Sequence, residues 1–201
     1  MYRAVIFDLG RVLVNFDFQR GYQALEGICP YRTAEIRRRL GTGDLVERFE
    51  TGFIEPHDFV AQLSSLLDLE IDYDRFCGIW TSIFTETLVP EEMLAGLAAR
   101  YRLLLLSNTN AIHFESLRQS HTMLRHFHHL VLSYEVKAMK PQAEIFQAAL
   151  AQAGCPPEEC FYTDDIADYI AAARRLGIDA VQFQSLSQLQ AELRARGICW
   201  E

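Results

Sequence analysis

The stretch Ala4-Val5-Ile6-Phe7-Asp8-Leu9-Gly10 joins an uninterrupted apolar run to an abrupt polar end. Apolar residues at four successive positions predict a β-strand that is buried on both faces, as in parallel sheets. A lone aspartate after such a strand is most often a turn residue or a helix cap. A functional interpretation of Asp8 therefore depends on which residues the rest of the chain places beside it.

The same pattern of a short apolar run with a polar end returns four times in the second half of the chain. These runs are Leu103–Leu106, Leu130–Leu132, Cys160–Thr163 and Ala180–Phe183. Helical patterns lie between them, over 90–100, 111–120, 143–153, 168–176 and 187–196. Strands that alternate with helices predict an α/β fold, with a Rossmann-like parallel sheet core and helices on both faces.

Glycines and a serine mark the ends of some of these helices. Gly177 and Gly197 each follow a helical pattern at the position where a left-handed C-terminal glycine is expected. Ser187, with Gln190 three residues later, predicts a capping box at the start of the last helix.

The stretch from Phe18 to Phe84 breaks the alternation, because it contains helical patterns and no convincing strand. The patterns lie near 19–26, 33–40, 44–50, 56–67 and 72–84. A simple crossover between parallel strands needs only one helix, so this block reads as an insertion. We expect a core over 1–15 and 88–201 and an all-helical cap over 16–87. Because the insertion leaves the sheet just after Asp8, the cap should lie above the carboxyl ends of the strands, where such sheets bind ligands.

Composition limits the classes of protein that the chain can represent. The 201 residues carry a formal charge of −8, which argues against a broad nucleic-acid surface. The five cysteines show no CxxC spacing and read as free thiols of a reducing compartment. No signal-peptide layout or membrane-length apolar run is present. We expect a cytoplasmic protein without a membrane or nucleic-acid partner, and its oligomeric state is open.

Polar residues collect where three of the expected strands end. They are Asp8, Ser107 with Asn108, and Asp164 with Asp165. The adjacent acids Asp164 and Asp165 repel each other unless a cation neutralises them, and a hard divalent metal suits such carboxylates. The residues alone leave two interpretations open: a metal site, or a set of turn and cap residues.

Four strings in order along the chain resemble the motifs of the haloacid dehalogenase (HAD) superfamily. They are Val5-Ile6-Phe7-Asp8-Leu9-Gly10-Arg11-Val12-Leu13, Leu104-Leu105-Leu106-Ser107-Asn108, Lys140-Pro141 with Ile145-Phe146, and Phe161-Tyr162-Thr163-Asp164-Asp165. The helical insertion is similar to the type-1 cap of that superfamily. The first and fourth strings look most like the branch that contains sugar-phosphate phosphatases and the phosphatase domain of epoxide hydrolases.

The resemblance implies a Mg²⁺-dependent phosphatase that acts on a small phosphorylated metabolite. Asp8 is the implied nucleophile and forms an aspartyl-phosphate, which water then hydrolyses. Mg²⁺ would be held by Asp8, by the main-chain carbonyl of Gly10 and by Asp165, with Asp164 as a further ligand or an orienting group.

The second and third strings imply the remaining site residues. Ser107 and Asn108 would hydrogen-bond the phosphoryl oxygens. Lys140 would be catalytic, placing a positive charge on the phosphate and beside the carboxylates.

One departure bears on mechanism: HAD phosphatases usually carry a second aspartate two residues after the nucleophile, which protonates the leaving group. Here that position is Gly10. Two explanations keep the phosphatase function: the leaving group needs no proton, as in a sugar 1-phosphate or an acyl phosphate, or another acid such as Asp17 supplies it. The third option is a different function: a haloacid dehalogenase-like C–X hydrolase, or a feeble or inactive phosphate-binding protein.

The cap should set substrate choice. Candidate pocket residues are Asp17, Tyr22, Arg48, Phe49 and Trp80, and helical periodicity makes core packing an equal alternative for each.

Overall fold

The computed structural model describes residues 1–201. Its main sheet has five parallel strands in the order β5-β4-β1-β6-β7, which confirms the expected α/β fold. The strands are β1 (Ala4–Phe7), β4 (Arg102–Ser107), β5 (His129–Leu132), β6 (Cys160–Asp164) and β7 (Asp179–Gln182). β1 is central, so Asp8 follows the middle strand of the sheet.

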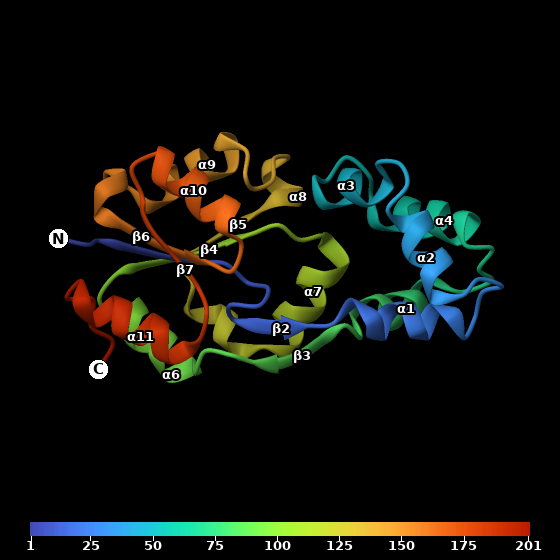
Figure 1. Ribbon diagram of the computed structural model, residues 1–201, viewed down its shortest axis with the longest axis horizontal. Coiled ribbons are helices and arrows are strands. Elements are labelled where there is room, and N and C mark those ends of the chain that lie inside the picture. Colours follow the sequence, from blue (N-terminus) through green and yellow to red (C-terminus); the bar gives the residue numbers. More distant parts are fainter.

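Helices cover both faces of this sheet (Figure 1). One face carries α6 (Glu91–Ala98), α7 (Ala111–Ser120) and α11 (Leu186–Ala195), and the other carries α9 (Ala143–Ala153) and α10 (Ala167–Arg175). The buried strands alternate between the two cores: Val5 and Phe7 pack on the first face, Ala4 and Ile6 on the second. Burial on both faces is what the continuous apolar run predicted.

Shorter elements complete the core. They are η1 (Thr122–His126), α8 (Ser133–Val136) and η2 (Pro157–Glu159). Gly177 and Gly197 have φ angles of +86° and +69°, as the helix-end prediction requires. The predicted capping box was wrong: Ser185, not Ser187, caps α11, and its Oγ accepts a hydrogen bond from the Gln188 N–H at 3.2 Å.

The insertion contains five helices that extend from one end of the sheet (Figure 1). They are α1 (Phe18–Glu26), α2 (Thr33–Leu40), α3 (Leu45–Glu50), α4 (Pro56–Leu66) and α5 (Tyr73–Thr81). Their apolar side chains form a cluster of their own, centred on residues such as Phe49, Phe59 and Phe76. The exact domain boundaries stay a prediction.

Two strands at the base of the insertion were not expected. β2 (Val14–Phe16) and β3 (Phe84–Thr87) pair antiparallel, so both chain crossings between the sheet and the insertion are tied together. The helix expected to reach Phe84 ends instead at Thr81. No helix has the length and apolar character that a membrane crossing requires.

Candidate active site

The strand ends bring the predicted polar residues together at one edge of the sheet. Asp8 follows β1, Ser107 ends β4, and Asp164 ends β6 with Asp165 next in the chain. One carboxylate oxygen from each of the three aspartates lies within 4.8 Å of the others. The Asp8 main-chain N–H also donates to the Thr163 carbonyl at 3.0 Å, which extends the sheet pairing to the first acid.

Lys140 lies in the middle of this cluster, from the loop before α9. Its Nζ donates to Asp8 Oδ1 and to Asp164 Oδ2, each at 2.6 Å, and to the Leu106 carbonyl at 3.1 Å. The lysine side chain is buried among these acceptors. Three carboxylates around one ammonium group leave two negative charges uncompensated when all are ionised, so a divalent cation fits the donor set.

Burial and the neighbouring charges together shift the ionisation of the cluster. Burial raises the pKa of the Asp8 carboxyl, the charge of Asp164 adds to the rise, and Lys140 opposes it. Burial also raises the pKa of Asp165, with Asp164 adding to the effect and Arg11 reducing it. For Lys140, burial alone would lower the pKa, but the two carboxylates that it contacts reverse the sign.

The two adjacent acids have different surroundings. Asp164 is fully buried and accepts hydrogen bonds from Lys140, from the Tyr162 hydroxyl and from the Ile166 N–H. The Asp165 carboxylate accepts no hydrogen bond from another residue and is partly exposed. Asp165 is therefore the freer of the two to meet a metal ion, and Asp164 is the better placed to orient Lys140.

The two residues expected to bind phosphate also differ. Ser107 makes no side-chain hydrogen bond within the protein and lines a cavity at the strand ends. The Asn108 side chain instead holds the Lys140 main chain, accepting from its N–H at 2.8 Å and donating to its carbonyl at 3.0 Å. Asn108 thus fixes the position of Lys140, and a direct contact between its amide and a phosphoryl oxygen stays a prediction.

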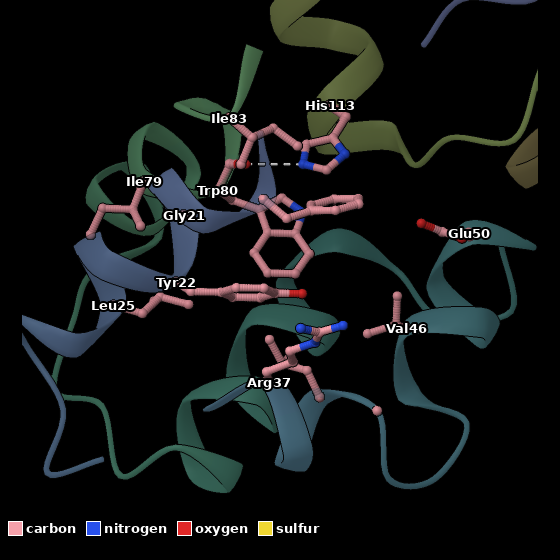
Figure 2. Close-up of a pocket in the computed structure, with 13 residues that line it drawn as sticks. Gly21, Tyr22, Leu25, Arg37, Val46, Glu50, Ile79, Trp80, Ile83 and His113 are labelled. Atoms are coloured by element: carbon pink, nitrogen blue, oxygen red, sulfur yellow. Dashed lines mark hydrogen bonds between the residues drawn. The ribbon is translucent and has the colours of Figure 1, made fainter. Parts of the chain in front are cut away.

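Two adjoining cavities lead from the insertion to the strand ends. The smaller, of about 80 Å³, is lined by residues that include Gly10, Ser107 and Asn108. The larger, of about 300 Å³, lies between the insertion helices and α7, and Figure 2 shows the side chains around it. The two share four lining residues: Phe18, Glu50, Ile83 and His113. A small molecule with its phosphate at the strand ends would place its remaining atoms in the larger cavity.

The candidate pocket residues of the cap lie in different environments. Tyr22 and Trp80 line the larger cavity. Phe49 is instead buried in the apolar cluster of the insertion. Arg48 forms an ion pair with Asp44, with 3.9 Å between a guanidinium nitrogen and Oδ1. Asp17 is exposed and caps α1, because its Oδ1 accepts a hydrogen bond from the Gln19 N–H at 2.9 Å. Asp17 lines neither cavity, so the structure does not bring it to the site.

Sequence reasoning missed two ionisable residues at the junction of the cavities. Glu50 is the last residue of α3, and its side chain points toward Trp80 and His113 in Figure 2. His113 lies in the first turn of α7. Neither belongs to a recognisable motif, because Glu50 reads as one more acid in a short charged helix and His113 as one more member of a helical pattern.

Comparison with known proteins places this geometry in a family. The model of haloacid dehalogenase-like hydrolases matches residues 2–177. A D-ribitol-5-phosphate phosphatase from Bacteroides thetaiotaomicron is 27% identical over 204 residues, which cover 96% of this chain and 97% of the relative. A phosphatase from Mycobacterium tuberculosis is 30% identical over 186 residues, which cover 88% and 85% of the two chains.

Solved structures agree with this placement. A HAD family enzyme from Bacteroides thetaiotaomicron, in complex with magnesium and inorganic phosphate, superposes with a TM-score of 0.84 at 27% identity and covers 94% of this chain and 99% of its own. An L-2-haloacid dehalogenase from Xanthobacter autotrophicus, at 19% identity and a TM-score of 0.63, covers 99% of this chain and 85% of its own and shares the fold. The chain belongs to the haloacid dehalogenase-like hydrolase family.

Proposed function

We propose that the protein is a Mg²⁺-dependent phosphatase that hydrolyses a small phosphorylated metabolite, with a sugar or polyol phosphate as the substrate class. The observation that carries the proposal is the cluster of three carboxylates and one buried lysine at the strand ends, beside a cavity that Gly10, Ser107 and Asn108 help to line. The relatives named as phosphatases, and the neighbour that holds magnesium and phosphate, support the same activity. A cytoplasmic location accords with the five free cysteines.

Asp8 is the proposed nucleophile, because it follows the central strand at the floor of the site. An Asp8 oxygen attacks phosphorus, the bond to the leaving oxygen breaks, and water later cleaves the aspartyl-phosphate. Lys140, which contacts Asp8, and the Ser107 hydroxyl are the proposed partners of the phosphoryl oxygens, where negative charge is spread in the transition state.

Asp8, Asp165 and the Gly10 carbonyl would hold Mg²⁺, with Asp164 orienting Lys140. A bound Mg²⁺ offsets the repulsion between the nucleophilic carboxylate and the incoming phosphate. The donor set also separates this function from the dehalogenase-like alternative. Displacement of halide requires no divalent cation, so three clustered carboxylates would be an unexplained electrostatic cost in a C–X hydrolase.

The size of the cavities limits the substrate. The larger cavity, of about 300 Å³ between the insertion helices and α7, suits a five- or six-carbon sugar or polyol. A sugar 1-phosphate fits the absence of an acid at Gly10. A polyol phosphate fits the relative that acts on D-ribitol 5-phosphate, provided that a proton donor is available.

The test is phosphate release from a panel of sugar, polyol and aryl phosphates, with Mg²⁺ and with a chelator. The wild type should release phosphate only with the metal, and Asp8→Asn should release none while keeping its circular dichroism spectrum, since the amide cannot form the phosphoenzyme. Turnover by Asp8→Asn, or full activity in the chelator, would overturn the proposal.

A further inference from the structure

The Phe16 ring fills the space at position 10, where HAD phosphatases usually carry the aspartate that protonates the leaving group. A Cβ atom added at Gly10 would lie 2.7 Å from Cε1 of Phe16, so the Phe16 ring occupies the space that a side chain at position 10 would need. The leaving oxygen of an alkyl phosphate is strongly basic, and a positioned general acid is worth ~10²–10⁴ in rate. A phosphatase for alkyl esters built on this site therefore needs a proton donor from elsewhere.

His113 reaches the junction of the two cavities, but its ring cannot donate a proton. Its Nε2 lies 3.0 Å from the Trp80 carbonyl oxygen, an acceptor, so Nε2 carries the hydrogen. Its Nδ1 accepts from the Asn110 amide at 3.0 Å. Burial lowers the pKa of His113 to about 4, so the ring is neutral near pH 7 with both nitrogens engaged.

Glu50 is different, because its carboxyl group is unpaired and lines both cavities. Burial raises its pKa to about 7, and the negative charge of Glu47 adds to the rise. The other polar groups on the larger cavity are the Trp80 indole N–H, which has no hydrogen-bond partner, and the side chains of Tyr22, Arg37 and His113. A carboxyl group that holds its proton near neutral pH, beside the position of the substrate, has the properties of a general acid.

The main chain around Glu50 is fixed to the core next to the loop that follows β4. The Ser133 hydroxyl donates to the Glu50 carbonyl at 2.6 Å and accepts from the Thr109 N–H at 2.9 Å. Lys137 Nζ donates to the Gly52 carbonyl at 2.7 Å. Ser133, 83 residues away from Glu50 in sequence, thus holds the end of α3 against the loop that follows β4.

We propose that Glu50 is the general acid and base of the reaction, in place of the acid that Gly10 cannot supply; this inference rests on the proposed phosphatase function. In the first step, an Asp8 oxygen bonds to phosphorus, the bond from phosphorus to the leaving oxygen breaks, and that oxygen takes the proton of the Glu50 carboxyl group. In the second step, the Glu50 carboxylate takes a proton from water as the water oxygen bonds to phosphorus. The bond between Asp8 and phosphorus then breaks, and phosphate leaves.

The test compares Glu50→Gln with the wild type on two esters in rapid-mixing experiments with Mg²⁺. On 4-nitrophenyl phosphate, whose leaving group departs without a proton, Glu50→Gln should release one nitrophenolate per site at close to the wild-type rate, and then turn over slowly because dephosphorylation lacks its base. On ribitol 5-phosphate, the first step itself should fall by ~10²–10⁴.

Glu55→Gln is the matched control, because Glu55 is exposed in the same insertion and lines neither cavity. It should behave as the wild type on both esters. An equal loss of the first step on both esters would overturn the proposal, since Glu50 would then position the substrate without donating a proton. Unchanged ribitol 5-phosphate hydrolysis by Glu50→Gln would overturn it too. If the wild type cleaves neither ester, the proposed phosphatase function itself fails.

Discussion

Replacing Glu50 by glutamine should make the protein more stable at alkaline pH. Burial raises the Glu50 pKa from its usual 4.5 to about 7, so the folded protein resists the charged form. At about 1.4 kcal/mol for each pKa unit, a charged Glu50 costs the folded state at most about 3.5 kcal/mol. Because the carboxyl group faces a cavity rather than packed apolar atoms, we expect a gain of about 1–3 kcal/mol in Glu50→Gln.

The sign of the pH dependence follows from the raised pKa. Below pH 4.5 Glu50 is protonated in both the folded and the unfolded states, so it contributes no pH-dependent stability. Between pH 4.5 and 7 the unfolded chain loses the proton first, and the free energy of unfolding of the wild type falls as pH rises. Above pH 7 Glu50 is charged in both states, and the folded protein bears the full cost of burying that charge. The advantage of Glu50→Gln should therefore grow from pH 5 to pH 8.

Urea denaturation at pH 5, 6, 7 and 8, in a chelator, measures this difference. Glu55→Gln corrects for the loss of one formal charge from the insertion. A gap between Glu50→Gln and the wild type that is the same at pH 5 and pH 8 would refute the reasoning, because it would mean that the carboxyl group is already hydrated or paired in the folded protein.

Three further predictions concern the carboxylate cluster and the position of the missing acid. Lys140→Met should lower the free energy of unfolding by about 3–5 kcal/mol in metal-free buffer, because two buried carboxylates lose their counter-charge; a loss below about 1 kcal/mol by chemical denaturation would contradict the buried ion pairs. Asp165→Asn should abolish the rise in Tm that Mg²⁺ produces, and Asp164→Asn should mainly lower the metal-free stability, by about 1–3 kcal/mol; equal effects in thermal scans would contradict their different surroundings. Gly10→Ala should cost about 1 kcal/mol in the wild type and nothing in a Phe16→Ala background, and a coupling energy below about 0.5 kcal/mol would show that the ring does not fill that space.

The parts of the site that lie on the sheet could be predicted from the sequence. Parallel strands end at one edge, so Asp8, Ser107 and the acids after β6 had to converge once the strands were recognised. The position of Lys140 followed only from the resemblance to a family, because it comes from a loop with no period of its own.

The parts of the structure that depend on how the insertion packs against the core could not be predicted from the sequence. Glu50 ends a helix of six residues, too short for periodicity to separate an inward face from an outward one. Its environment is set by Ser133, which lies far away in sequence. β2 and β3 have three and four residues, and Thr85, Glu86 and Thr87 give β3 no apolar pattern. Their pairing with each other, not their composition, makes them strands.

The attachment of α3 to the core also has an evolutionary consequence. Where the proton donor is carried by the loop after the first strand, an insertion can be exchanged for another and change the substrate while the chemistry stays complete. In this protein the donor that we propose, Glu50, belongs to the insertion itself. Two residues later, Gly52 contacts the core so closely that a Cβ atom there would lie 1.9 Å from the Tyr134 carbonyl oxygen. Substrate choice and proton transfer are thus inherited together, and a chimera that receives a foreign cap should lose both.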